Sequence, residues 1–167
     1  SLRRQRQMCI RDRLILINHP LDCPICDAAG ECRLQDLVAE FGLDKQDYTL
    51  EARRERGPKD FTSPLIRYWP DRCVLCLRCV RADQEIVRAN VLDVEGSGYD
   101  ARVVVKAQER CIFCGECVRV CPVGALTERS SEVRARAWQR EDVRTTCNHC
   151  SLGCQLRLGV FEGKVIR

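Results

Sequence analysis

The chain has 167 residues, among them 14 Cys but only 4 Phe, 3 Tyr and 2 Trp. That length allows one or two small domains, and so few aromatic side chains make an apolar core of ordinary size hard to build. We therefore expect the cysteines to hold parts of the chain in shape. No apolar stretch approaches the about 18 residues that a membrane span needs, and nothing resembles a secretory signal. This predicts a soluble, intracellular chain with no direct membrane insertion.

The net charge of +4 is confined to the first 13 residues. This segment, SLRRQRQMCIRDR, holds five Arg and one Asp, whereas residues 14–167 hold 23 basic and 23 acidic side chains. Because the body of the chain has no basic face, no nucleic acid is expected as a partner. Residues 1–13 look like a translated sequencing-adaptor string and are left out of the fold and ligand predictions; the alternative is a genuine amphipathic helix start. Cys9 stands alone under either interpretation.

The other 13 Cys fall into four groups separated by long stretches without Cys. The first group is Cys23, Cys26 and Cys32; the second is Cys73, Cys76 and Cys79; the third is Cys111, Cys114 and Cys117, followed by Cys121; the fourth is Cys147, Cys150 and Cys154. Repeated C-x2-C spacing without an export signal is typical of metal sites and not of disulfide frameworks, because a tight turn aims both sulfurs at one centre. Triplets spaced three apart favour cuboidal [4Fe–4S] clusters over zinc, which usually takes two pairs. A zinc-binding structural module stays open as an alternative.

Residues 14–43 are predicted to form a small irregular unit around the first group. His19 precedes this group in the spacing H-x3-C-x2-C-x5-C and is expected to complete its ligand set, because the three Cys lack a fourth partner. An imidazole in place of a thiolate removes a negative charge and should raise the potential of the cluster. We expect a helix to end at residues 14–18 and another to run over residues 34–41, with Gly42 as its stop.

Residues 71–128 are predicted to be ferredoxin-like, after a polar connector over residues 44–70. The string RCVLCLRCVR matches RCIFCGECVR in the second half of this unit, which indicates an internal duplication. Between the two Cys loops we expect a helix over about residues 77–88 and strands near residues 91–94 and 102–106, with a second helix after the second loop. The run CIFCGECVRVCP is the complete bacterial ferredoxin motif C-x2-C-x2-C-x3-C-P.

The ferredoxin motif predicts which residue completes which cluster. In two-cluster ferredoxins the fourth Cys of each run ligates the other cluster, so Cys121 is expected to join the second group. By the same rule the third group should be completed from position 83, four residues after Cys79, and that residue is Asp83. Asp83 could ligate iron as a harder oxygen donor, could leave a labile three-iron cluster, or could merely face solvent at a degenerate site.

Residues 129–144 are interpreted as an Arg-rich linker, in which Trp138 is expected to anchor against a neighbouring part. The fourth group follows in TTCNHCSLGC, with the spacing C-x2-C-x3-C and no fourth ligand after it. His149 stands between two ligand positions and is interpreted as a bystander. The run QLRLGVFEGKVIR predicts a hairpin that turns at Glu162 and Gly163 and has little to pack on, so residues 145–167 are expected to be the truncated start of a larger domain.

Several of these motifs together resemble a known family. HPLDCPICDAAGECRLQDL resembles the one-histidine, three-cysteine signature of the large iron–sulfur subunit of respiratory complex I, called the G subunit in bacteria and the 75 kDa subunit in mitochondria. Formate dehydrogenase alpha subunits and some hydrogenases share this signature. RCVLCLRCVR, CIFCGECVRVCPVGALTE and RARAWQREDVRTTC extend the similarity over residues 14–167, and TTCNHCSLGCQLRLGVFEGKVIR is similar to the opening of a molybdopterin-oxidoreductase domain.

The resemblance implies an α+β fold in three iron–sulfur units. These are a small irregular one-histidine, three-cysteine domain, a ferredoxin-like two-cluster domain and the truncated start of a molybdopterin-oxidoreductase domain. The implied cofactors are two complete [4Fe–4S] clusters, the first of them ligated by His19 and the next by the second group with Cys121. A third cluster is Asp83-ligated, three-iron or absent, and a fourth lacks its last ligand. Molybdopterin would belong only to a downstream region.

Electron transfer is the function that the resemblance implies. The chain would be a fragment of an NADH dehydrogenase (quinone) oxidoreductase that resembles the G subunit or, alternatively, of a molybdenum or tungsten formate dehydrogenase alpha subunit. The Cys triplet of the third group without a Cys at position 83 leaves both members open. Expected partners are the other subunits of such an oxidoreductase, including a flavin- and NADH-reactive one. We expect a cytoplasmic location, on the cytoplasmic side of the inner membrane if the complex is bound there, and no catalytic residue or complete active site in this chain.

Overall fold

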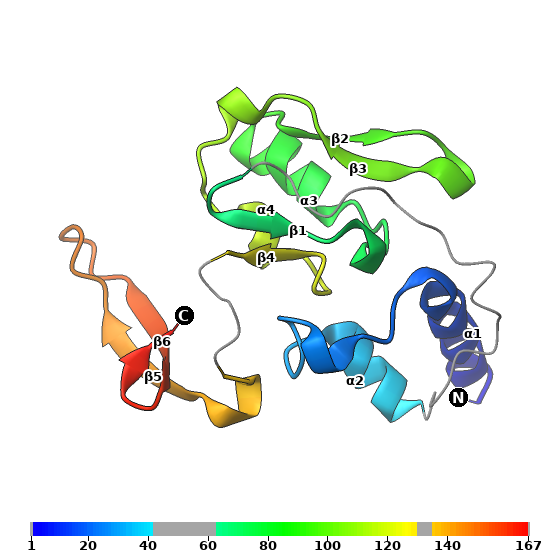
Figure 1. Ribbon diagram of the computed structural model, residues 1–167, viewed down its shortest axis with the longest axis horizontal. Helices are drawn as coiled ribbons and strands as arrows, with labels where there is room; N and C mark the ends of the chain where they lie inside the picture. The colour runs from blue at the N-terminus through cyan, green and yellow to red at the C-terminus, as the bar shows by residue number, and fades with distance from the viewer. Residues whose placement is uncertain (1, 42–62, 130–134, 167) are drawn as a thin grey trace.

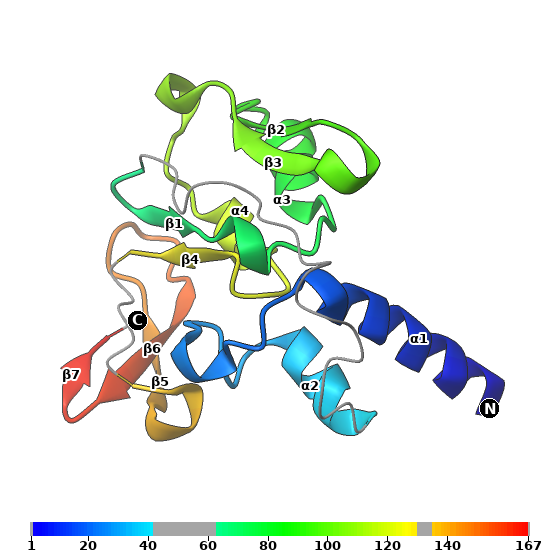
Figure 2. The same ribbon diagram turned by 45° about the vertical axis from the view of Figure 1, so that its right-hand side comes forward.

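The computed structural model describes residues 2–41, 63–129 and 135–166. The described chain forms three successive parts: two helices around a Cys loop, a ferredoxin-like unit of small sheets and short helices, and a three-stranded sheet (Figure 1). The first part and the C-terminal sheet lie on the same side of the ferredoxin-like unit (Figures 1 and 2). This mixture of helices and small sheets confirms the predicted α+β class. Within the described ranges, none of the helices combines the length and hydropathy that a membrane span requires.

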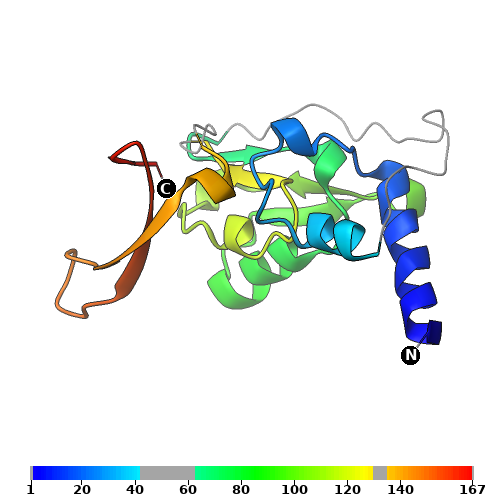
Figure 3. The same cartoon turned by 90° about the horizontal axis from the view of Figure 1, so that it is seen from below.

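The first part consists of α1 (Leu2–Asn18), a 3₁₀ turn (Cys23–Ile25) and α2 (Arg33–Glu40). Leu16 of α1 and Leu34 of α2 are buried in one apolar cluster with Val123 and Ala125 of the ferredoxin-like unit, so this packing holds the first Cys loop against that unit. The N-terminal end of α1 projects away from the rest of the molecule (Figure 3). Residues 2–13 belong to this helix. Gly42, the predicted helix stop, lies outside the described residues.

The ferredoxin-like unit combines two Cys loops with two antiparallel pairs of strands. Its elements are β1 (Ile66–Tyr68), α3 (Arg78–Arg81) with a π-helical continuation (Ala82–Val87), β2 (Leu92–Glu95), β3 (Arg102–Val105), α4 (Glu116–Arg119) and β4 (Leu126–Glu128). β1 pairs with β4, and β2 pairs with β3. The buried members of its core are Ile66, Tyr68, Cys79, Val80, Val91, Leu92, Val103 and Leu126. Since Cys79 belongs to this core, the first loop of the unit and its apolar packing form one structure.

The connector predicted over residues 44–70 is too long, because β1 lies inside it. Ile66 and Tyr68 are buried and Arg67 between them is half-buried, which is the alternation of a strand. Three residues are too few for this alternation to stand out in a sequence, and the partner strand β4 follows about 60 residues later. Most of the predicted connector, residues 44–62, lies outside the described residues.

The backbone repeats the duplication that the sequence shows. Leu75 and Leu77 have φ angles of 53° and 58°, and Phe113 and Gly115, at the equivalent positions of the second loop, have φ angles of 54° and 75°. Left-handed conformations are uncommon for residues such as Leu and Phe, so their recurrence at matched positions is specific. Both loops are therefore shaped by the same two turns, and each leads directly into a short helix, α3 or α4.

The C-terminal sheet has the strand order β5–β6–β7, with β5 (Glu141–Thr146), β6 (Gln155–Phe161) and β7 (Lys164–Val165) all antiparallel. Glu162 and Gly163 both have positive φ angles, 49° and 73°, which is the two-residue hairpin turn expected there. The predicted linker over residues 129–144 is too long at its end, because β5 begins inside it. The string EDVRTT carries no alternating apolar pattern that would reveal the strand.

The C-terminal sheet is tied to the first Cys loop. The ring of Trp138 and the Cβ of Ala137 lie close enough to Gly30 that a Cβ added to Gly30 would be 3.0 Å from each. Gly30 also has a φ angle of 86°, so its turn and this close approach both favour glycine. The Arg140 guanidinium forms an ion pair with Glu31 of the same loop. Trp138 thus approaches the first Cys loop but is 70% exposed, so its expected anchoring against a neighbouring part stays a prediction.

Candidate metal centres

The predicted ligands lie at four places, which we number in chain order. Site 1 is His19, Cys23, Cys26 and Cys32; site 2 is Cys73, Cys76, Cys79 and Cys121; site 3 is Cys111, Cys114, Cys117 and Asp83; site 4 is Cys147, Cys150 and Cys154. Every one of these Cys is a free thiol. Over the described ranges, no three His, Cys, Asp or Glu side chains gather closely enough to hold a single metal ion. Cluster ligands have a different requirement, since each binds its own iron atom at a separate corner.

Site 2 brings four thiols to one cavity. All four Cys line the same pocket, together with apolar side chains that include Tyr68, Val103 and Leu126. Three of the thiols come from the loop before α3 and the start of that helix, and Cys121 reaches them from the turn after α4. The structure therefore places Cys121 with the second group of Cys. Four thiols in an apolar pocket are a donor set that fits a [4Fe–4S] cluster.

Burial raises the pKa of two of the site 2 thiols. It raises the pKa of Cys79 to about 12, together with the neighbouring thiols of Cys73 and Cys121. Burial also raises the pKa of Cys121 above its ordinary value. Thiols in this state are protonated at neutral pH, so metal binding must displace their protons. The backbone N–H of Leu75 donates to Sγ of Cys73 at 3.4 Å.

Site 3 joins the second Cys loop to the helix that follows the first loop. Its three Cys line one cavity with Asp83, which lies in the π-helical segment Ala82–Val87. Asp83 is only 8% exposed, so the alternative in which it merely faces solvent is wrong. Burial, together with the nearby thiols of Cys114 and Cys111, raises the pKa of Cys117 to about 11. The donor set of site 3 is thus three thiols beside one buried carboxylate.

The Asp83 carboxylate also has a structural role. Its Oδ2 accepts hydrogen bonds from the backbone N–H of Val91 at 2.6 Å and of Leu92 at 2.8 Å. These bonds to a charged acceptor hold the start of β2 against the helix. Two accepted bonds occupy both lone pairs of Oδ2, so only Oδ1 could bind a metal.

Site 1 contains a buried imidazole whose tautomer follows from its hydrogen bond. His19 is 7% exposed, and its Nδ1 lies 3.0 Å from the backbone carbonyl oxygen of Arg72. Because a carbonyl oxygen can only accept, Nδ1 carries the proton, and in the neutral ring Nε2 then carries the lone pair that can bind a metal. Burial raises the pKa of both Cys23 and Cys26, and the thiol of Cys32 raises both further. The imidazole and three thiols fit the ligand set that the spacing predicts.

Sites 1 and 2 approach each other at two points. The Sγ of Cys32 lies 3.8 Å from the carbonyl oxygen of Pro122, the residue after Cys121. The residue whose carbonyl accepts the His19 proton, Arg72, directly precedes Cys73. Each of these contacts therefore joins a ligand of site 1 to the chain next to a ligand of site 2.

Two residues that sequence reasoning missed contact site 1 from distant positions in the chain. Gly124 approaches so closely that a Cβ at this position would lie 2.3 Å from Sγ of Cys26. The Arg136 guanidinium donates to the carbonyl oxygen of Cys26 at 2.9 Å and also to that of Pro24. Arg136 and Cys26 are 110 residues apart, so no local motif could have revealed the contact.

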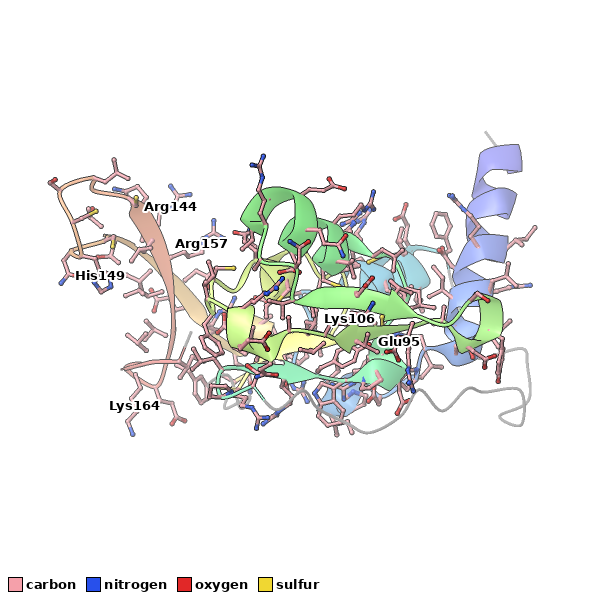
Figure 4. The ribbon with its side chains drawn as sticks, turned by 90° about the horizontal axis from the view of Figure 1, so that it is seen from above. Glu95, Lys106, Arg144, His149, Arg157 and Lys164 are labelled. Carbon is pink, nitrogen blue, oxygen red and sulfur yellow. The ribbon has the colours of Figure 1, made fainter. Side chains whose placement is uncertain are left out.

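Site 4 lies at the tip of the hairpin between β5 and β6. The backbone N–H of Cys147 donates to the carbonyl oxygen of Cys154 at 2.8 Å, which closes the loop. Cys150 and Cys154 are exposed. His149 is also exposed and lies at the tip of the hairpin (Figure 4), and its interpretation as a bystander stays a prediction.

Comparisons with known proteins identify the iron–sulfur regions. Residues 13–47, which include site 1, match the NADH-ubiquinone oxidoreductase-G iron-sulfur binding region, and residues 104–127 match a 4Fe-4S binding domain. The chain is 41% identical over 157 residues to the G 2 subunit of the NADH-quinone oxidoreductase of Rhizobium meliloti (strain 1021), a match that covers 92% of this chain and 18% of the relative. The resemblance to the large iron–sulfur subunit of complex I is confirmed.

Two further proteins are similar to this chain. The chain is 40% identical over 157 residues to the NADPH-Fe(3+) oxidoreductase subunit alpha of Geobacter sulfurreducens, again over 92% of this chain and 18% of the relative. It thus spans less than a fifth of the length of both curated relatives. A crystal structure of an NAD+-reducing [NiFe]-hydrogenase in the H2-reduced state shares its fold, with a TM-score of 0.67 and 23% identity over 77% of this chain and 58% of that chain.

Proposed function

We propose that the chain transfers single electrons through [4Fe–4S] clusters as a segment of the large iron–sulfur subunit of an NADH dehydrogenase (quinone). When bound, such clusters supply one-electron exchange with little rearrangement. The observation that carries the proposal is site 2, where four thiols from two distant segments line one apolar cavity. The matches to iron–sulfur regions around sites 1 and 3 support it.

Sites 1 and 2 are the proposed complete ligand sets. In site 1, Nε2 of His19 and the thiolates of its three Cys would bind iron, while the Arg72 carbonyl holds the imidazole in place through Nδ1. In site 2, four thiolates would do so. A neutral imidazole leaves site 1 one negative charge short of site 2, so its potential should be the higher of the two, other factors being equal.

The contacts between these sites supply a route for the electron. One route runs from His19 through its hydrogen bond to the Arg72 carbonyl and the following peptide bond to Cys73. The other runs from Cys32 to the Pro122 carbonyl and along the chain to Cys121. The first route is hydrogen-bonded or covalent over its length, whereas the second crosses the 3.8 Å from Sγ of Cys32 to the Pro122 carbonyl oxygen through space, because an iron-bound thiolate has no proton to donate.

Site 3 is proposed to hold a cluster on its three thiolates, with Oδ1 of Asp83 as a weak oxygen ligand at the fourth corner. The carboxylate lies in the cavity of the three thiols, but its other oxygen is committed to the backbone of β2. An oxygen donor is harder than a thiolate, so this corner should lose iron most easily. Site 4 is proposed as an incomplete set of three thiolates.

As part of a larger oxidoreductase, the chain would exchange electrons with other subunits, including a flavin- and NADH-reactive one. We propose a position on the cytoplasmic side of the inner membrane for such a complex. The proposal assigns no catalytic residue to this chain.

The test is to purify the full chain without oxygen and to measure iron, acid-labile sulfide, zinc and the electron paramagnetic resonance spectrum after reduction. We expect brown protein with at least about eight iron atoms per chain, from the two complete sites, and signals of reduced [4Fe–4S] clusters. Cys76→Ser should remove the signal of one cluster, whereas Cys9→Ser, outside all four groups, should change nothing. Colourless protein with zinc as its one stoichiometric metal would overturn the proposal in favour of a zinc-binding module.

A further inference from the structure

Arg72 is the most completely buried charged residue among those described, and it lies between sites 1 and 2. It is 1% exposed and directly precedes Cys73. A buried guanidinium is costly unless its charge and its donors are compensated. The charge of Arg72 therefore needs a negative partner, and its N–H groups need acceptors.

Two of the three nitrogens of the Arg72 guanidinium have hydrogen-bond partners in the protein. Its Nε and Nη2 both donate to Oδ2 of Asp22, at 2.9 Å and 2.6 Å. Its face lies 4.3 Å from the ring centroid of Trp69, a cation–π contact. These contacts fix the plane of the guanidinium, and Nη1 is the nitrogen that takes part in none of these hydrogen bonds.

The remaining edge has no partner within the described chain. Nη1 of Arg72 is buried and donates to no group there. A buried charged group with an unpaired donor is rare in native proteins, because the donor loses its hydrogen bonds to water and gains none from the protein. The position therefore calls for an acceptor that the polypeptide does not provide.

The groups around Arg72 belong to segments that carry the predicted ligands of sites 1 and 2. Asp22, the ion-pair partner, directly precedes Cys23 of site 1. Arg72 itself directly precedes Cys73 of site 2, so the ion pair of Arg72 and Asp22 joins the chain next to one ligand of each site. Finally, the backbone carbonyl of Arg72 accepts the proton of His19.

We infer that Arg72 is a positioning and potential-setting residue of site 1, whose Nη1–H donates to a sulfur atom of the cluster and whose charge favours the reduced cluster. This role depends on the cluster assignment of the proposed function. A reduced cluster carries one more negative charge than an oxidised one, so a buried cation beside it raises the potential. Asp22 opposes this effect, because its negative charge pairs with the Arg72 guanidinium and directly precedes Cys23 in the chain.

The duplication supplies a matched control. Arg110 occupies the equivalent position before Cys111, but it is exposed. The same sequence context thus holds one arginine that is buried next to a site and one that faces solvent. A substitution at Arg110 tests the effect of the sequence change alone.

The experiment is a redox titration of the full chain, purified without oxygen and followed by the paramagnetic signal of site 1. Arg72→Gln should disfavour reduction of this cluster at least tenfold, a downward shift of about 59 mV for one electron. Arg72→Lys should recover at least half of the shift, Asp22→Asn should shift the potential upward, and Arg110→Gln should leave it unchanged. General damage to the fold would not produce shifts of opposite sign at two partners of one ion pair.

The possible results distinguish failure of the proposed function from failure of the role of Arg72. An absent site 1 signal in the wild-type chain would overturn the proposed function itself. A present signal whose potential is unchanged in Arg72→Gln, or shifts as far in Arg72→Lys, would overturn the role of Arg72 alone. If Arg72→Gln does not assemble the cluster, the potentials of Arg72→Lys and Asp22→Asn provide the test. A lower potential of site 1 in Asp22→Asn would then contradict the role of Arg72.

Discussion

At the scale of single residues, Asp83 combines a proposed ligand position with a structural role that its hydrogen bonds show. In the duplicated sequence it stands four residues after Cys79, as Cys121 stands four residues after Cys117. Its carboxylate accepts two backbone hydrogen bonds from the buried residues Val91 and Leu92. A thiol is a weak acceptor and could not replace both bonds. The departure from Cys is therefore coupled to how β2 begins.

We expect Asp83→Cys to turn site 3 into a four-thiolate site. Bound iron should rise, and any three-iron signal of the oxidised protein should disappear, since thiolate holds iron more firmly than carboxylate. The amides of Val91 and Leu92 should exchange faster, because losing a charged acceptor costs about 1.5–3 kcal/mol per bond. Iron analysis, paramagnetic resonance and hydrogen exchange of the holoprotein measure these effects.

Asp83→Asn is the matched control for this change. The amide keeps the size of the side chain and offers no thiolate, so iron should not rise, while exchange at Val91 and Leu92 should still accelerate because the acceptor is uncharged. An Asp83→Cys protein with wild-type iron and wild-type exchange would show that Asp83 neither borders a cluster nor holds β2.

The sequence predicted the members of the sites better than the residues around them. Cysteine spacing is a local property, and the duplication aligns Asp83 with Cys121, so both could be found by reading along the chain. The Asp83 hydrogen bonds, the burial of Arg72 and the approach of Gly124 to Cys26 depend on tertiary packing. No periodicity or motif records such contacts, because each joins segments that the sequence keeps apart.

At the scale of elements, the two Cys loops of the ferredoxin-like unit share their backbone turns, and the helices that follow them are short. Both loops use left-handed residues at the same two positions, whereas α4 contains four residues and α3 contains four before its π-helical continuation Ala82–Val87. Helices this short are not stable alone. The strands were predictable where apolar residues recur, as in β2 and β3, and not where three residues pair across the chain, as in β1. Contacts between elements must therefore supply the order that propensity does not.

Gly124→Ala tests the contact between the ferredoxin-like unit and the first Cys loop. The new Cβ would lie 2.3 Å from Sγ of Cys26 and 3.3 Å from Cβ of Ala28. The sulfur cannot move away if it binds iron, so we expect site 1 to lose iron or change its paramagnetic spectrum while site 2 keeps its signal. Overpacking of this kind costs about 1–3 kcal/mol, which thermal unfolding of the holoprotein should detect.

Gly98→Ala is the control for adding a methyl group at a glycine. Its new Cβ would meet nothing within 4 Å, although the φ angle of 55° makes the substitution mildly unfavourable. This variant should keep the spectra of both sites. Equal spectra in Gly124→Ala and Gly98→Ala would mean that Gly124 does not constrain site 1.

At the scale of the whole molecule, the proposed metal sites lie within small apolar cores. The two core clusters are small, and each includes a Cys that lines a site, Cys79 in one and Cys32 in the other. Sheets of two strands, as in the ferredoxin-like unit, are at best marginally stable in water. The scarcity of aromatic residues in the sequence already pointed to this arrangement. Which loops contact one another could not be predicted, because that depends on how three small parts pack together.

Removal of iron should therefore abolish the fold of sites 1 and 2 together. We expect chelation at neutral pH, without oxygen, to remove most of the far-ultraviolet circular dichroism and the cooperative thermal transition, because binding free energy at such sites is folding free energy. Iron with sulfide and reductant should restore both signals, and zinc alone should not. Loss of one site should also weaken the other, since Leu16 and Leu34 pack against Val123 and Ala125 across the boundary between them. A metal-free chain that still melted cooperatively at the holoprotein temperature would show that the apolar clusters suffice to hold the fold without iron.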